Sequence, residues 1–377
     1  MRNLLTLSFI FCFNFSFCQT FYLFIGTYTD SGSKGIYVYK FDATSGKAVW
    51  VSNTDSVVNP SYLTVSNDHK NIYAVNETNH ATPGAVSSFA FDQKAGTLKF
   101  INKQESGGDD PCYISITKNK KWVVVANYSG GSVAALPLNK DGSLKRYAQL
   151  IQDSGKSINA DRQEGPHVHS AVFSPDEKFV FTPNLGTDKI MEYHFDANKT
   201  YPLSPAKPAY TSTIAGSGPR HFTFSPDHTH AYLMQEMSGT VNVYTYSENK
   251  TQHGKLKLIQ SIITHPQNYK GLPGSADIHV SPDGNYLYAS NRGEENTITI
   301  FSINKTTGKL LLKGYSQCGG KTPRNFIIDP SGNYLLAANQ NSNNIAIFKR
   351  NKLTGLLTPT NEEIKVPKPV CLQMIKY

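Results

Sequence analysis

One two-strand unit recurs along almost the whole chain. It is clearest over residues 218–244, where Gly218-Pro219 opens an alternating run and Ser225-Pro226-Asp227 turns the chain into a second apolar run. Glycine, proline, serine and aspartate favour turns, and alternating apolar and polar residues are typical of half-buried strands. The unit therefore predicts a β-hairpin.

Aligned on the turn, six copies have these anchor residues: Ser66, Thr117, Ser174, Ser225, Ser281 and Asp329. Successive anchors are 51, 57, 51, 56 and 48 residues apart, a period typical of propellers and solenoids. The chain ends complete a seventh copy, with later strands from residue 21 and a first strand over residues 368–377. Closing a ring by pairing these ends leaves no free sheet edge.

The expected fold is therefore all-β, a seven-bladed β-propeller with four-stranded antiparallel blades that forms a single domain over residues 21–377. Two long polar connections, residues 152–164 and 265–274, are predicted to overhang the same face of the ring.

Residues 1–20 have the pattern of a cleaved signal peptide. Arg2 precedes an apolar run, and Ser16 and Cys18 are spaced like a signal-peptidase site. The run is too short for a membrane span, and no other stretch is long enough. The sequence predicts an exported protein, periplasmic or secreted, whose mature chain begins near Gln19.

Charge and cysteine usage exclude several function classes. The formal net charge is +9, but the lysines are scattered, so no nucleic-acid partner is expected and the charge favours anionic small molecules. Cleavage leaves Cys112, Cys318 and Cys371, which lack metal-type spacing and imply no disulfide framework. We expect them to pack as small apolar residues.

Chemically unusual residues stand at the two positions that each hairpin brings together. In an antiparallel pair the start of the first strand meets the end of the second, so both positions line one mouth of the channel if the first strand is innermost. Before the first strands stand His167, His169, Arg220, His221, Asp277 and Arg324. After the second strands stand Glu77, Asn127, Tyr128, Asn184, Glu236, Arg292 and Asn339.

Structural explanations of these residues stay open. Repeated asparagines can bond to backbone at strand ends, and the charged residues can form ion pairs between blades. His279 lies in the middle of a first strand where other units have residues such as Thr64 and Ile327, and it is either a hydrogen-bonded channel residue or a functional one.

Several motifs resemble those of the lactonase family of seven-bladed propellers, which includes propeller-type 6-phosphogluconolactonases and carboxymuconate lactonising enzymes. They are GPHVHSAVFSPD from Gly165, GPRHFTFSPD from Gly218, MQEMSGTV from Met234, SADIHVSPDGNYLYASNRG from Ser275 and TPRNFIIDPSGNYLLAANQ from Thr322. The resemblance spans residues 21–377. It departs from the family at Tyr113, where members often carry histidine.

The resemblance implies a catalytic group of His169, Arg220, Glu236 and Arg292. His167 is the alternative to His169, which is preferred because it occupies the position that Arg220 fills in the next unit. Placement at the same mouth makes four further residues the predicted substrate-binding set: His167, His279, Arg324 and Asn339.

The implied activity is that of a lactone hydrolase that opens a sugar-acid lactone by water attack at the mouth of the channel. Glu236 or His169 would be the base, and Arg220 and Arg292 would hold the oxyanion and an acidic or phosphorylated group of the substrate. No cofactor or metal is expected, and the expected oligomeric state is a monomer.

Three alternatives stay open. One is a carboxymuconate-type lactonising enzyme. Another is a metal-dependent sugar lactonase, in which Glu77 and the neighbouring asparagines would hold a divalent cation. The last is a non-catalytic binding propeller, since a fold alone does not establish a function.

Overall fold

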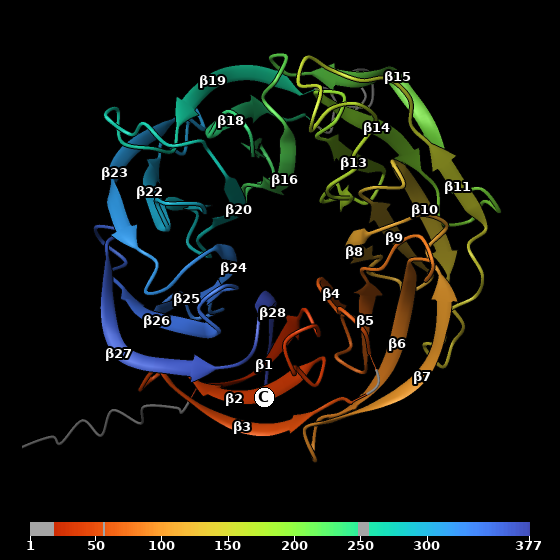
Figure 1. Ribbon diagram of the computed structural model, residues 1–377, viewed down its shortest axis with the longest axis horizontal. Helices are drawn as coiled ribbons and strands as arrows, with labels where there is room; N and C mark the ends of the chain where they lie inside the picture. Colours follow the sequence, from red (N-terminus) through yellow and green to blue (C-terminus); the bar gives the residue numbers. More distant parts are fainter. Residues whose placement is uncertain (1–18, 56, 248–255) are drawn as a thin grey trace, which may run out of the picture.

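The computed structural model describes residues 19–55, 57–247 and 256–377. These residues form 28 strands in seven four-stranded antiparallel sheets. The sheets stand as blades around a ring, and the first strand of each blade lies nearest the axis (Figure 1). The predicted seven-bladed β-propeller is confirmed.

The blades are numbered in chain order. Blade 1 contains β28 (Pro369–Lys376), β1 (Thr20–Thr27), β2 (Tyr37–Asp42) and β3 (Lys47–Asn53). Blade 2 contains β4 (Leu63–Val65), β5 (Asn71–Asn76), β6 (Ala85–Asp92) and β7 (Thr97–Glu105). Blade 3 contains β8 (Pro111–Ile116), β9 (Trp122–Asn127), β10 (Ser132–Pro137) and β11 (Gln149–Gln152).

The remaining blades repeat the same order. Blade 4 contains β12 (Val172–Phe173), β13 (Phe179–Asn184), β14 (Lys189–Phe195) and β15 (Leu203–Ser212). Blade 5 contains β16 (Pro219–Phe224), β17 (His230–Gln235), β18 (Thr240–Thr245) and β19 (Lys257–Ile263). Blade 6 contains β20 (Ser275–Val280), β21 (Tyr286–Asn291), β22 (Thr297–Ile303) and β23 (Leu310–Gln317). Blade 7 contains β24 (Pro323–Ile328), β25 (Tyr334–Asn339), β26 (Asn344–Arg350) and β27 (Leu357–Lys365).

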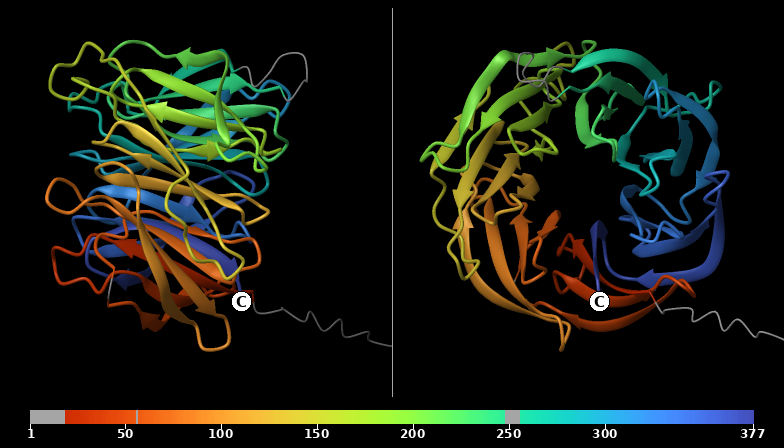
Figure 2. Two further views of the ribbon diagram at one scale, coloured as in Figure 1. Left: turned by 90° about the vertical axis from the view of Figure 1, so that its right-hand side faces the viewer. Right: turned by 180° about the vertical axis from the view of Figure 1, so that it is seen from behind.

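Blade 1 closes the ring as the sequence predicts. Strand β28 pairs antiparallel with β1, from Phe21 opposite Lys376 to Gly26 opposite Cys371. Figure 2 shows β28 and β1 side by side in the ring. Strand β1 begins at Thr20, so the predicted leader boundary at residue 20 falls inside a strand, and residues 1–18 of that leader lie outside the described residues.

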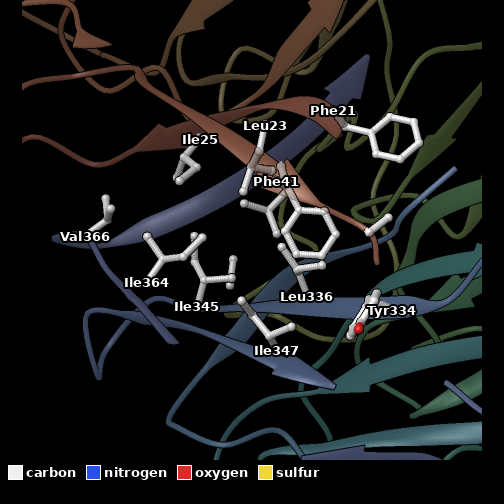
Figure 3. Packing of buried hydrophobic residues seen from close by; sticks show 13 residues of the cluster. Phe21, Leu23, Ile25, Phe41, Tyr334, Leu336, Ile345, Ile347, Ile364 and Val366 are labelled. Carbon is white, nitrogen blue, oxygen red and sulfur yellow. The ribbon is translucent and has the colours of Figure 1, made fainter. Parts of the chain in front are cut away.

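The core lies between neighbouring blades. Between blades 1 and 7, Phe21, Leu23 and Phe41 face Leu336 and Ile345, all of them buried (Figure 3). The second strands of blades 2 to 7 are buried along their whole length, because adjacent blades cover both of their faces. This burial explains why they read as short, mainly apolar runs rather than as a strict alternation. Within the described ranges, no helix has the length and apolar character needed to cross a membrane.

Candidate active site

In blades 2 to 7, the residue that follows the second strand is held by the same kind of backbone hydrogen bond. We call this residue the exit residue. Its N–H donates to the carbonyl oxygen of a residue that precedes the first strand of the same blade. The exit residue Glu236 donates its N–H to Gly218 O at 2.7 Å, and Arg292 donates to Gly274 O at 3.2 Å. Because the bond joins backbone atoms, it holds the position whatever side chain stands there. Exit residues of different blades therefore project from equivalent places at one end of the ring.

A β-bulge lies at the start of the innermost strand of blade 5. The register between β16 and β17 shifts between residues 219 and 222. In a regular strand, Arg220 and His221 would point to opposite faces. The bulge re-aims them, so that Arg220 contacts Glu236 while the ring of His221 lies 5.5 Å from that of His169.

Glu236 is the centre of a cluster of three arginines and one histidine. Its Oε2 atom lies 2.9 Å from Arg220 Nε and 3.0 Å from Arg292 Nη2. Its Oε1 atom accepts a hydrogen bond from Arg162 Nη2 at 2.7 Å. His169 Nε2 lies 3.9 Å from Oε2. We call these five residues the Glu236 cluster; it unites the four predicted catalytic residues with Arg162, from the loop between β11 and β12.

The positive charges of the cluster determine the protonation state of the Glu236 carboxyl group. Burial alone would raise the pKa of Glu236, but the guanidinium groups of Arg292 and Arg220 outweigh it and hold this pKa well below its usual range. Burial lowers the pKa of Arg220 to about 10, which still leaves the guanidinium charged at neutral pH. Glu236 is therefore an ionised carboxylate at neutral pH.

His169 is a neutral imidazole at neutral pH. Burial lowers its pKa well below the usual value, and the positive charge of Arg220 lowers it further. Its Nδ1 atom lies 3.8 Å from the sulfur of Cys112, a neighbour that the sequence analysis did not foresee. Burial raises the pKa of Cys112, so the thiol stays protonated and is a packing group rather than a nucleophile.

A second polar group forms around the buried Asp277. Its carboxylate lies 2.7 Å from His221 Nδ1 and 2.9 Å from His279 Nε2, and it also accepts a hydrogen bond from Asn325. Burial lowers the pKa of His221 to about 4. Burial also acts to lower the pKa of His279, but the negative charge of Asp277 and its hydrogen bond together outweigh burial and raise this pKa. The structure thus joins His279 to Asp277 rather than directly to Glu236.

A third group contains Arg324. Its Nη2 atom lies 3.9 Å from Glu77 Oε2, and its guanidinium stands 5.4 Å from the ring centre of Tyr28. The hydroxyl of Tyr28 donates to Glu77 Oε1 at 2.7 Å. The proposed metal ligand Glu77 thus faces a cation, and among the residues that the structure describes, no three His, Cys, Asp or Glu side chains gather in a way that could hold a metal ion.

The two remaining predicted residues differ in their placement. The ring of His167 stacks on Tyr128 at 4.6 Å, and the Tyr128 hydroxyl accepts a hydrogen bond from Arg162 at 3.2 Å, which puts His167 beside the Glu236 cluster. Asn339 is fully buried and donates to the backbone oxygen of Cys318 at 3.0 Å. This is the strand-end bonding that the sequence analysis left open as the alternative for the asparagines.

Aromatic rings from three blades meet beside the cluster. Tyr62 of blade 2 stacks on Tyr113 of blade 3 at 4.1 Å, and both rings lie within 5.8 Å of the ring of His221 in blade 5. Blades 2 and 5 are not neighbours, so this contact spans the centre of the ring (Figure 1). Tyr113, the departure from the family pattern, therefore lies next to the Asp277 group.

A family comparison matches this architecture. The model of the family described as "Lactonase, 7-bladed beta-propeller" matches residues 22–374. The chain belongs to this family. It is 38% identical over 357 residues to a 6-phosphogluconolactonase from Formosa agariphila, covering 94% of this chain and 99% of that protein. It is 31% identical to the 6-phosphogluconolactonase of Bacillus subtilis, covering 93% and 97% of the two chains.

A solved structure is similar to this chain in both fold and sequence. The periplasmic gluconolactonase of Pseudomonas aeruginosa superposes with a TM-score of 0.89 at 35% identity, covering 94% of this chain and 99% of that one. The family resemblance read from the motifs is thus confirmed over nearly the whole chain.

Proposed function

We propose that the Glu236 cluster hydrolyses a polyhydroxylated, acidic lactone by water attack at one mouth of the propeller channel. The general class, a lactone hydrolase, follows from the family and from the relatives named above. The observation that carries the site assignment is the convergence of an ionised carboxylate, a neutral imidazole and three guanidinium groups at one end of the ring. Lactone opening requires this combination of a base and anion-stabilising donors.

The proposed reaction starts with water held between Glu236 and His169. Glu236 takes a proton from the water as its oxygen attacks the lactone carbonyl, and the resulting oxyanion accepts hydrogen bonds from Arg292. Collapse of the tetrahedral intermediate breaks the ring C–O bond. The departing alkoxide then receives the proton from Glu236, which leaves a hydroxy acid and the enzyme in its starting state.

The positive charge of the cluster supports an acidic substrate. Three guanidinium groups against one carboxylate leave a local excess of two positive charges. A phosphate, with a charge of about −2 at neutral pH, would balance this excess, and a carboxylate would offset half of it. We therefore propose 6-phosphoglucono-1,5-lactone or a related aldonolactone as the substrate class.

The direct test is lactone hydrolysis by the purified protein, corrected for spontaneous opening. We expect Arg292→Lys to lower kcat/KM by about tenfold, because an ammonium keeps the charge but loses the fork of donors that a guanidinium presents. Circular dichroism should show an unchanged fold. Wild-type rates in this variant would remove Arg292 from the site, and no hydrolysis by the wild type would favour a binding propeller.

We also propose that the protein is exported after cleavage near Gln19. The support is the Arg2-led apolar run with Ser16 and Cys18, together with the periplasmic location of the Pseudomonas aeruginosa relative. Mass spectrometry of the protein from its native cell should find a chain that starts near Gln19. An intact residue 1–18 segment on that protein would contradict export by this route.

A further inference from the structure

The three arginines of the Glu236 cluster are held very differently. Arg220 is 1% exposed and also donates to the backbone oxygen of Ala276. Arg292 is 17% exposed, and its Nε donates to Gly274 O at 2.9 Å. Backbone carbonyls thus fix both guanidinium groups. Arg162 is 46% exposed, and its side chain bonds to Glu236 and to the hydroxyl of Tyr128.

The backbone beneath Arg162 is nevertheless anchored. The neighbouring Gln163 is fully buried, and its Nε2 donates to Leu185 O at 2.8 Å and to Asp188 Oδ2 at 2.7 Å. The N–H of Arg162 itself donates to Asn159 Oδ1 at 3.0 Å. The guanidinium can therefore leave Glu236 by side-chain rotation, while the loop stays in place.

We propose that Arg162 is the displaceable cation of the cluster: an acidic group of the substrate takes its guanidinium from Glu236, which selects acidic lactones and frees Oε1 of Glu236 to act as the base. This inference rests on the proposed function and extends it to substrate selection. Before exchange, one carboxylate oxygen is engaged by Arg162 and the other by Arg220 and Arg292. After exchange, Arg162 pairs with the substrate anion, so no charge is left unpaired.

Alternative partners of Arg162 are few. The hydroxyl of Tyr128 is neutral at physiological pH, because burial raises its pKa. The carboxylate of Glu164 lies nearby on the same loop but bonds to His167 Nε2 at 3.0 Å. An incoming phosphate or carboxylate thus competes with Glu236 for a partly exposed guanidinium that no backbone carbonyl is seen to hold in the described part of the chain.

The test compares two lactones that differ in one anionic group, 6-phosphoglucono-1,5-lactone and glucono-1,5-lactone. For Arg162→Met, we expect kcat/KM for the phosphorylated lactone to fall about 30-fold, the scale of lost charge-assisted hydrogen bonds. The value for the uncharged lactone should rise, because Oε1 of Glu236 is no longer engaged by a guanidinium and is free to act as the base. Arg146→Met, which removes an exposed arginine on the outside of blade 3, is the matched control and should change neither value.

A second measurement, the pH profile of kcat/KM, reports the ionisation of Glu236. With the uncharged lactone, the acidic limb of the pH profile of kcat/KM should move to higher pH in Arg162→Met, because loss of a nearby positive charge raises the pKa of Glu236. Arg162, Arg220, Arg292 and His169 contact this carboxylate. Tyr128 and Arg324 also lie near enough to interact with its charge. A residue that only braces the loop would not move this limb.

Binding of the product 6-phosphogluconate, measured by calorimetry, separates this inference from the proposed function. Binding should weaken about 30-fold in Arg162→Met, and binding of gluconate, which has a carboxylate but no phosphate, should weaken less. Equal losses for both lactones, or unchanged product binding, would overturn the role of Arg162. A wild type that hydrolyses neither lactone would instead overturn the proposed function, and the binding comparison would still decide whether Arg162 receives the anion.

Discussion

Glu236→Gln should lower kcat for lactone hydrolysis by about two orders of magnitude or more, because it removes the base while keeping the size of the side chain. The carboxylate is also the counter-ion of three arginines, so its loss disturbs the donors that hold the oxyanion. Both effects act on the transition state, so kcat should fall with kcat/KM. Steady-state kinetics with 6-phosphoglucono-1,5-lactone measure the loss.

The folding stability of the Glu236→Gln variant must be measured together with its activity. Removing one partner of a buried ion pair costs about 3–5 kcal/mol in other proteins, because it leaves uncompensated charge. Glu192→Gln is the matched control, since Glu192 is a fully buried glutamate of β14 that bonds to Thr211 rather than to the Glu236 cluster. It should keep wild-type kcat. Equal activity of Glu236→Gln and Glu192→Gln would show that Glu236 has only a structural role, as part of an ion-pair network.

The pH profile of the wild type provides an independent check. Because the arginines lower the pKa of Glu236, its base form persists to a lower pH than that of an ordinary glutamate. The acidic limb of kcat/KM should therefore lie below pH ~4.3, the usual value for this side chain. In Glu236→Gln this limb should disappear.

Deleting residues 368–377 should unfold the protein. The deletion removes β28, in which Val370, Leu372 and Ile375 are buried, and exposes the edge of β1. Burial of such a side chain is worth roughly 1.5–3 kcal/mol, so the total of about 5–9 kcal/mol approaches the whole stability of a typical domain. Strand β28 contributes to the core on both sides, with Leu372 facing blade 7 and Cys371 facing blade 2.

The measurement is thermal unfolding together with light scattering. We expect the truncated chain to lose its cooperative transition or to aggregate through the open strand edge. Adding a synthetic peptide of residues 366–377 should restore part of the transition, whereas a scrambled peptide should not. A truncated chain that kept the wild-type thermal midpoint and stayed monodisperse would show that closure by β28 is dispensable.

The sequence predicted the blades well because their signals are local. Turn triplets such as Ser225-Pro226-Asp227 mark each hairpin, and hairpin geometry then brings distant chain positions to one end of the ring. This logic predicts that Arg220, Glu236 and Arg292 lie at the same end of the ring. It also located the closing strand to within a residue or two.

The features of the site that the sequence does not predict depend on tertiary packing. The bulge that turns Arg220 and His221 toward the same region leaves no signal in the alternation pattern. Arg162 belongs to a loop whose path is set by burial of Gln163, so no periodicity points to it. The contact between Cys112 and His169 was accessible in principle, because these residues occupy the same position in neighbouring units.

The backbone hydrogen bond that holds each exit residue has a consequence for how new activities can arise on this scaffold. Glu236 and Arg292 occupy equivalent exit positions yet carry opposite charges, and the bond beneath them is the same. The side chain at each of these positions can therefore be substituted while the backbone hydrogen bond keeps the residue in place and the packing between the blades changes little. An enzyme designer could vary the exit residues combinatorially and leave the interior between the blades untouched.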